Sequence, residues 1–217
     1  MQDYADARRH MVDSQIRPNK VTDERIMEAM GQVPRESFVP PSLKGVAYVD
    51  EDIEIAPGRF LIEPQVLARL IQAAEIEPTD AVLEIGAATG YGSAILSHLA
   101  ESVVAVESDQ QLAEIANKAL AVLEVTNVAV VEGELDKDYS RQGPFNVVFV
   151  NGAVEQMPES WTKALEEGGR LVCVEIIGGT GKAVLYTKVA GVPGRRILFD
   201  ARTPLLPGFQ RAPAFVF

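Results

Sequence analysis

The stretch Val82–Gly92, VLEIGAATGYG, decides the fold. It begins as a short apolar run with the branched side chains of a buried strand, and it ends where a helical pattern starts. Three glycines in the connecting loop allow a sharp turn and let the backbone approach a ligand closely. The first question is therefore what kind of ligand such a loop would bind.

The loop lacks the spacing of phosphate-binding loops. A dinucleotide fingerprint needs a second glycine two residues after the first, and Ala88 follows Gly86 at that spacing. A later stretch, GGTGKA at 178–183, resembles a P-loop, but Ile176 stands where that motif has glycine and Ala183 where it has Ser or Thr. We interpret 178–182 as a turn between two strands.

The pattern that is present is E-x-G-x-A-x-G, from Glu84 to Gly90. A carboxylate at the mouth of the loop repels a pyrophosphate and favours a ligand that carries positive charge. S-adenosylmethionine (SAM) has an ammonium, a sulfonium and no phosphate. Ala88 stands between the two glycines of this pattern, which we expect to be tolerated if its φ is negative.

Further acids follow the next two apolar runs. Glu107 ends SVVAVES, 21 positions after Gly86, where an acid can accept hydrogen bonds from ribose hydroxyls. Glu132 and Gly133 end the run after it, where they would meet an adenine amino group. Ligands of open parallel sheets bind at this edge, so the ordered set predicts a SAM site. The alternative is that these acids only cap strands or face solvent.

Apolar runs alternate with helical segments after Pro78, which predicts an α/β fold with a mainly parallel sheet covered on both faces. The runs are 81–85, 102–106, 127–131, 146–151 and 169–177, and the helical segments are 91–100, 110–123 and 158–166. Residues 183–189 are expected to add an antiparallel C-terminal edge. The tail from Arg202 is expected to be loop with a short apolar terminal strand.

The N-terminal part has a different texture. Helices are predicted over 3–16 and after an N-cap at Thr22, and a third begins at Pro64. Residues 42–62 are expected to be loop with short extended pieces. We interpret 1–217 as a single domain, in which a helical and loop extension (1–78) packs on an α/β core (79–217).

Composition excludes several classes of function. The net charge of −11 opposes sequence-independent binding to nucleic acid, and there is no run of about 18 apolar residues to span a membrane. The polar N-terminus does not have the pattern of a secretory signal. One cysteine, Cys173 in an apolar run, indicates a reducing compartment, for which the cytoplasm is our expectation. One cysteine and two distant histidines predict no metal site.

The C-terminal segment is basic, with six basic residues and one acid from Lys182 onward. It would either attract an anionic substrate or form an edge hairpin protected by charge.

Four stretches together resemble the protein-L-isoaspartate O-methyltransferase family. They are HMVDSQIRPNKVTDERIMEAMGQVPRESFVPP (10–41), AYVDEDIEI (47–55), VLEIGAATGY (82–91) and EEGGRLV (166–172). The resemblance covers most of the chain and is weakest in its last third. It implies a Rossmann-like SAM-dependent methyltransferase fold and an enzyme that methylates the free carboxyl of isoaspartyl residues in damaged proteins.

The resemblance also implies which residues line the cofactor site. They are Glu84, Gly86, Ala87, Ala88, Thr89, Gly90, Tyr91, Glu107, Ser108, Glu132 and Gly133. Asp50 matches the acid of the family's AY.D segment.

The chain departs from the family where the substrate should dock. The family has G.TISQP before the third helix, whereas this chain has GRFLIEP at 58–64. Phe60 replaces threonine, Ile62 replaces the serine thought to hold the substrate carboxylate, and Glu63 adds a negative charge. Desolvating a carboxylate without a donor costs on the order of several kcal/mol.

These losses do not by themselves abolish the reaction. An isoaspartyl carboxylate is already ionised at pH 7, so methyl transfer needs positioning and desolvation and no general base. Backbone amides near 60–63, Asn151 or Arg59 would replace the missing hydroxyls, although a lone arginine beside a glycine is usually solvated. We assign no catalytic residue and consider Ile62, Asp50 and Asn151 as positioning candidates.

Three functions follow from this sequence. The first is an isoaspartyl methyltransferase with an altered substrate clamp. The second is a methyltransferase of the same fold with a different, more apolar acceptor, and the third is a non-catalytic SAM-binding protein. The expected partners are isoaspartyl proteins or an unidentified acceptor, with no nucleic acid or membrane, and the chain is expected to be a monomer or weak dimer.

Overall fold

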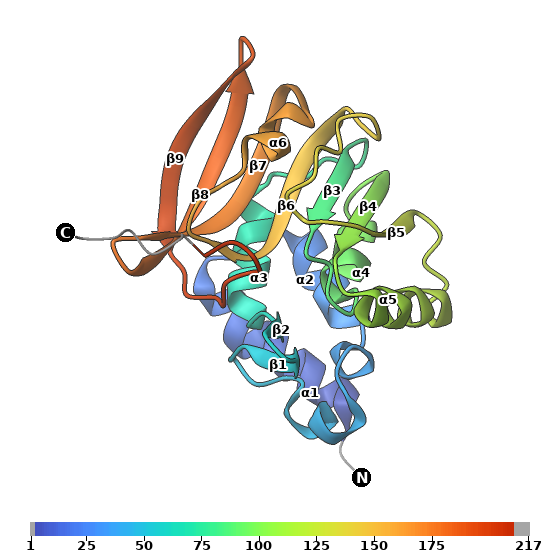
Figure 1. The fold of residues 1–217 in the computed structure, drawn as a ribbon. Coiled ribbons are helices and arrows are strands. Elements are labelled where there is room, and N and C mark those ends of the chain that lie inside the picture. Colours follow the sequence, from blue (N-terminus) through green and yellow to red (C-terminus); the bar gives the residue numbers. More distant parts are fainter. Residues whose placement is uncertain (1–2, 211–217) are drawn as a thin grey trace, which may run out of the picture.

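A seven-stranded sheet forms the centre of the computed structural model, which describes residues 3–210 (Figure 1). Its order is β5-β4-β3-β6-β7-β8-β9. The strands are β3 (Ala81–Ile85), β4 (Ser102–Glu107), β5 (Val128–Glu132), β6 (Phe145–Val154), β7 (Leu165–Ile177), β8 (Thr180–Val189) and β9 (Val192–Asp200). The first five are parallel and the last two antiparallel, which confirms the predicted sheet.

Helices and a small hairpin surround this sheet. The helices are α1 (Tyr4–Met11), α2 (Glu24–Gln32), α3 (Pro64–Ala73), α4 (Tyr91–Ser97), α5 (Gln110–Val122) and α6 (Glu159–Lys163). A π-helical turn, Val12–Ile16, extends α1, and short 3-10 turns lie at Arg17–Asn19, Arg35–Ser37 and Pro41–Val46. The hairpin pairs β1 (Ile53–Ala56) with β2 (Arg59–Leu61), so 42–62 has the short extended pieces predicted for it.

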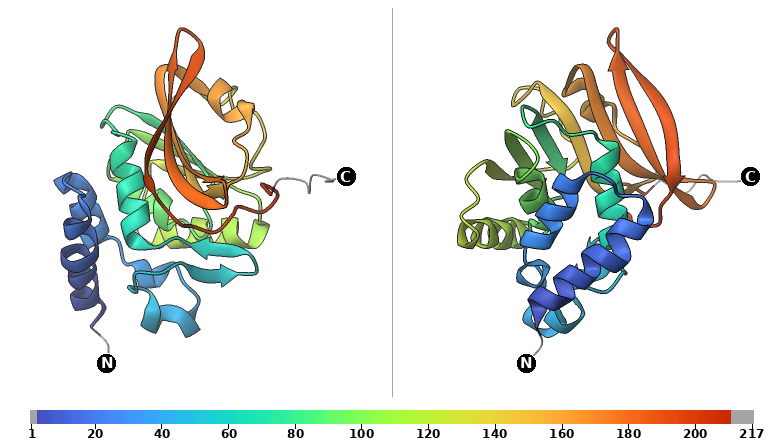
Figure 2. Two further views of the ribbon diagram at one scale, coloured as in Figure 1. Left: turned by 90° about the vertical axis from the view of Figure 1, so that its left-hand side faces the viewer. Right: turned by 180° about the vertical axis from the view of Figure 1, so that it is seen from behind.

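Successive side chains of a strand point to opposite faces of the sheet, so continuous apolar strands place apolar side chains on both faces. Both faces are covered by other elements. Val82 joins a cluster with the N-terminal helices, α3 and α4, while its neighbour Leu83 joins a second cluster with Trp161 of α6. Figure 2 shows the N-terminal helices gathered on one side of the sheet. Cys173 is buried in the second cluster, in keeping with its place in an apolar run.

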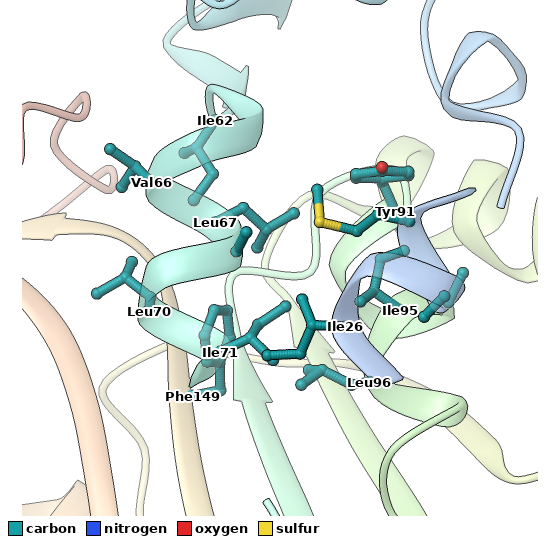
Figure 3. Close-up of a cluster of buried hydrophobic side chains, with 14 of the residues drawn as sticks. Ile26, Ile62, Val66, Leu67, Leu70, Ile71, Tyr91, Ile95, Leu96 and Phe149 are labelled. Atoms are coloured by element: carbon teal, nitrogen blue, oxygen red, sulfur yellow. The ribbon is translucent and has the colours of Figure 1, made fainter. Parts of the chain in front are cut away.

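The first cluster joins the N-terminal segment to the sheet. Ile26 of α2, Leu67 and Ile71 of α3, Leu96 of α4 and Phe149 of β6 meet in it (Figure 3). The division at residue 78 stays an interpretation, because this cluster takes residues from both sides of it.

Two expected boundaries lie elsewhere. The N-cap of α2 is Asp23, whose carboxylate accepts from the Arg25 amide at 2.9 Å, because Thr22 is held through its own amide by the Gln72 side chain at 2.6 Å. The helix expected over 158–166 is only Glu159–Lys163 because β7 begins at Leu165.

One feature of the C-terminal third also differs from the sequence pattern. An additional strand, β9, pairs antiparallel with β8 and forms an exposed edge of the sheet. The sequence did not predict it, because its Pro, Gly and Arg residues are not typical of a strand. The expected apolar terminal strand lies mostly outside the described residues. Within 3–210, no helix combines the length and apolar character that crossing a membrane requires.

The strand order reverses at β3, which lies between β4 and β6. Ligands of such sheets bind at the carboxyl ends of the strands beside this switch point. The carboxyl ends of β3 and β4 point toward the β1–β2 hairpin (Figure 1). The glycine loop after β3 and the end of β6 therefore occupy the place where a ligand is expected.

Candidate functional site

The loop between β3 and α4 is held in a tight left-handed path. Gly86 and Gly90 have φ of 81° and 92°, a region that favours glycine. Ala88 also has a positive φ, 53°, and not the negative value expected from the sequence. Its amide donates to the Glu107 carboxylate at 2.6 Å, and this bond holds the alanine in the less favourable conformation.

Glu84 lies fully buried beneath this loop. It accepts hydrogen bonds from the Ser93 hydroxyl and from Nδ2 of Asn151, the latter at 3.1 Å. Both donors are neutral, and burial raises the pKa of Glu84 to about 7. A Cβ on Gly92 would overlap the Glu84 carboxylate, so a larger residue there would require this carboxylate to shift. Glu84 is therefore a buried acid that ionises near neutral pH.

Glu107 ends β4 with both carboxylate oxygens occupied. Oε1 accepts from the amides of Ser108 at 2.9 Å and Asp109 at 3.1 Å, and Oε2 accepts from Ala88. The Ser108 hydroxyl also donates to Oε1, at 3.4 Å, and Nη2 of Arg59 donates to Oε2 at 2.5 Å. Arg59 is 5% exposed, so the expectation that it is solvated is wrong. Its guanidinium crosses from the β1–β2 hairpin into the candidate site.

Glu132 and Gly133 lie on the same edge as Glu107. Glu132 pairs in register with Glu107 at the ends of β5 and β4, and the Gly133 amide donates to the Glu107 carbonyl at 3.0 Å. The structure therefore brings the predicted strand-end acids together along neighbouring strands. The Glu132 side chain is exposed.

Three predicted cofactor residues turn their side chains away from this edge. The Thr89 hydroxyl donates to the Phe38 carbonyl at 2.6 Å, and Tyr91 packs edge-on against the Phe38 ring. Ala87 and Tyr91 both belong to the cluster shared with the N-terminal helices, where Figure 3 shows Tyr91. Side chains held in this way leave the backbone as the part that faces a ligand.

The positioning candidates lie in two different places. Ile62 and Asn151 line one small cavity of about 10 Å³, whereas Asp50 does not. Within residues 3–210, Oδ1 of Asn151 is buried without a hydrogen-bond partner. Burial raises the pKa of Asp50. The structure therefore associates Ile62 and Asn151 with the glycine loop and leaves Asp50 apart from it.

The C-terminal tail, which was expected only to be loop, covers the glycine loop through Leu206. Leu206 packs so closely on Gly152 that a Cβ there would lie 2.7 Å from its side chain, and it also covers Gly86. Two backbone bonds, Ala153 N to Pro204 O at 2.9 Å and Leu206 N to Ala153 O at 2.8 Å, fix the segment to β6. No local pattern marks Leu206 because its role depends on a contact distant in sequence.

An open groove also borders the hairpin. It has a volume of about 460 Å³ and is lined by Glu51, Asp52, Phe60, Glu63, Arg202, Thr203 and Pro204. Burial, together with the nearby Asp52 and Asp50 carboxylates, raises the pKa of Glu63 to about 7. Phe60 thus faces the groove, while Ile62 is buried in the core.

The polar groups of the loop edge fit SAM. Glu84 and Glu107 offer carboxylates at adjacent strand ends, and Oδ1 of Asn151 is a buried acceptor without a partner among the described residues. Two acids and an acceptor amide suit a cationic ligand that has no phosphate. Beside Asn151 the remaining space is the cavity of about 10 Å³, which Arg59 and Leu206 also line. A larger cavity, of about 310 Å³, lies beside Ser108.

Comparisons with known proteins give one consistent family. The family model for protein-L-isoaspartate(D-aspartate) O-methyltransferase (PCMT) matches residues 6–190. A protein-L-isoaspartate O-methyltransferase of Koribacter versatilis is 37% identical over 97% of this chain and 96% of its own length. One of Protochlamydia amoebophila is 40% identical over 75% of this chain and 77% of its own.

Solved structures show the same fold. A protein-L-isoaspartate O-methyltransferase with 25% identity superposes with a TM-score of 0.80 over 92% of this chain and 66% of that chain. A Plasmodium falciparum protein-L-isoaspartate O-methyltransferase in complex with S-adenosyl-L-homocysteine (SAH) gives a TM-score of 0.80 at 17% identity, over 92% of this chain and 97% of that one.

Proposed function

Because this chain belongs to the protein-L-isoaspartate O-methyltransferase family, we propose that it transfers the methyl group of SAM to the carboxylate of isoaspartyl residues in proteins. Two things support the proposal: the match of residues 6–190 to the family, and one structural observation. Two buried acids, Glu84 and Glu107, flank a left-handed glycine loop at the switch point of the sheet. That arrangement supports binding of a cationic cofactor without phosphate.

The proposed cofactor contacts divide by the part of the ligand they suit. Glu107 would accept the ribose hydroxyls, Glu132 and Gly133 would meet the adenine, and Glu84 with Asn151 would favour the positive charges. The remaining proposed contacts are Gly86, Ala87, Ala88, Thr89, Gly90, Tyr91 and Ser108. The cofactor itself supplies an electrophilic methyl group.

The chain's own contribution to the reaction is positioning and the exclusion of water. An isoaspartyl carboxylate is ionised at neutral pH, so no residue has to remove a proton from it. Ile62, which is buried beside Asn151, would keep water from the reacting carboxylate. Donors that hold the carboxylate in line with the methyl group therefore matter most for the rate.

The groove favours a second candidate, a methyltransferase with a different acceptor. Three carboxylates (Glu51, Asp52 and Glu63) and the Phe60 ring line it, against one basic residue, Arg202. Such a surface suits an apolar or cationic acceptor better than an anionic one.

Transfer of radiolabelled methyl from SAM to a synthetic isoaspartyl peptide tests the two candidates, with the matching aspartyl peptide as control. The proposed function predicts label on the isoaspartyl peptide alone. Equal labelling of both peptides, or no labelling despite SAM binding in calorimetry, rejects it. The variant Phe60→Thr sharpens the test, since a gain of about tenfold or more on isoaspartyl peptide would indicate that the natural chain favours another acceptor.

We propose that the protein acts in a reducing compartment, the cytoplasm. One buried cysteine supports it. The net charge of −11 supports the absence of nucleic acid among the partners. We also propose that the chain is a monomer or a weak dimer.

A further inference from the structure

Arg59 reaches the centre of the candidate cofactor site from outside the seven-stranded sheet. It opens β2, and its guanidinium forms an ion pair with Glu107 in which both side chains are nearly or fully buried. The same Nη2 lies 3.6 Å from the position that a Cβ on Gly86 would take. The guanidinium thus covers both the strand-end acid and the backbone of the glycine loop.

The Glu107 carboxylate has no acceptor position left for a ribose. A carboxylate offers about four acceptor positions, and Glu107 accepts from three backbone amides, from Arg59 and, at 3.4 Å, from the Ser108 hydroxyl. The amides of Ala88, Ser108 and Asp109 belong to the loops that shape the site, so they cannot leave without unfolding it. The Arg59 side chain can leave, because it comes from the separate two-stranded hairpin.

A displaced Arg59 requires another anion nearby, since an unpaired guanidinium in a buried site is costly. Its Nε already has no hydrogen-bond partner within residues 3–210. Arg59, Ile62 and Asn151 line the same small cavity. Ile62 and Phe60 offer no hydroxyl there, so Arg59 is the cationic donor beside the place where the acceptor carboxylate has to lie.

We propose that Arg59 binds two carboxylates in turn, that of Glu107 before the cofactor binds and that of the methyl acceptor afterwards. The second partner rests on the proposed function. The exchange makes cofactor and acceptor binding mutually favourable, because the cofactor frees the guanidinium and the acceptor holds it away from Glu107. Such coupling has the same size in both directions.

Calorimetry on the full chain tests this exchange without turnover. SAH is titrated into the natural protein, Arg59→Gln and Arg59→Lys, each with and without an isoaspartyl peptide. Arg59→Gln removes the competing charge, so we expect SAH to bind about fivefold tighter or more than to the natural protein. In the natural protein, saturating SAH should tighten peptide binding by about fivefold or more, and this coupling should fall to about one in Arg59→Gln. Arg59→Lys should retain part of it.

The matched control is Arg170→Gln. Arg170 also pairs with an acid, Asp80 at 2.6 Å, but Asp80 precedes β3 and so lies away from the glycine loop. We expect its SAH binding and coupling to equal those of the natural protein. Unchanged or weaker SAH binding in Arg59→Gln overturns the proposal, as does an equal change in Arg170→Gln.

The SAH titration also separates this inference from the proposed function. Tighter SAH binding by Arg59→Gln, with no peptide binding to any protein, supports the competition at Glu107. That result overturns both the acceptor carboxylate as second partner and the proposed function.

Discussion

At the scale of single residues, Glu84 is the group whose charge depends most on its surroundings. Its only hydrogen-bond donors in the described structure are a hydroxyl and an amide, and burial raises its pKa to about 7. The carboxylate is therefore only partly ionised at neutral pH. A cationic ligand would favour the ionised form and would in turn be favoured by it.

Comparison of SAM with SAH isolates this charge, since the two ligands share the ammonium and differ by the methyl group on the sulfonium. We expect the ratio of dissociation constants, SAH over SAM, to rise about fivefold between pH 6 and pH 8 as Glu84 ionises. Glu84→Gln keeps hydrogen bonds to Ser93 and Asn151 and should give a flat ratio. Fluorescence or calorimetric titrations check this, with the exposed Glu101→Gln as control; a flat ratio in the natural protein contradicts the role of Glu84.

At the scale of elements, the start of α3 carries an unusual concentration of acid. Glu63 occupies the N-cap position but caps no amide with its side chain. An acid at this helix end is normally favoured by the helix dipole. Here burial and the carboxylates of Asp52 and Asp50 outweigh that effect and raise the Glu63 pKa to about 7.

This raised pKa makes stability fall as the pH rises. The folded chain binds a proton at Glu63 more tightly than the unfolded chain does, so the stabilisation is full below the unfolded pKa near 4.5 and is lost as pH passes through about 7. Between pH 5 and pH 8 we expect the unfolding free energy of the natural chain to fall relative to Glu63→Gln. The difference is on the order of 1 kcal/mol after solvent screening is allowed for. Urea unfolding at both pH values measures it, and parallel pH profiles for the two proteins would refute the assignment.

At the scale of the whole molecule, Arg35 joins the N-terminal segment to the hairpin and the core. Its buried guanidinium donates to the carbonyls of Ala47 and Ile62, both at 2.8 Å, and lies 4.8 Å from the centre of the Tyr91 ring. Burial lowers its pKa. One side chain thus donates to two buried carbonyls and contacts a third part of the chain, the Tyr91 ring.

Removing Arg35 should lower the free energy of unfolding of the whole chain, which we expect to unfold in one transition. Arg35→Ala leaves two buried carbonyls without donors, which costs about 3 kcal/mol or more of unfolding free energy. Arg25→Ala, which breaks the partly exposed pair with Asp23, should cost less than about 1 kcal/mol. The transitions followed by far-UV circular dichroism and by the fluorescence of Trp161, on the far face of the sheet, should coincide in all three proteins. Separate transitions would show that 1–78 unfolds independently of the core.

The sequence predicted most of the sheet because its central strands are continuous apolar runs. It did not predict β9, whose exposed residues pair with one neighbour only and need no apolar pattern. The loop and the strand-end acids were also predictable, since topology alone brings strand ends together. Arg59 and Leu206 could not be placed from the sequence. Their contacts with Glu107 and Gly86 depend on how distant segments pack.

The cover that Leu206 forms over the glycine loop has a consequence for synthesis on the ribosome. Gly86 is translated roughly 120 residues before Leu206, a delay of about 6 to 24 seconds at about 5–20 residues per second. The nascent chain therefore passes through a stage in which β3, β4 and the loop have emerged but the segment that closes over them has not. Until Leu206 has emerged, the side chain that covers Gly86 and Gly152 in the complete fold is absent.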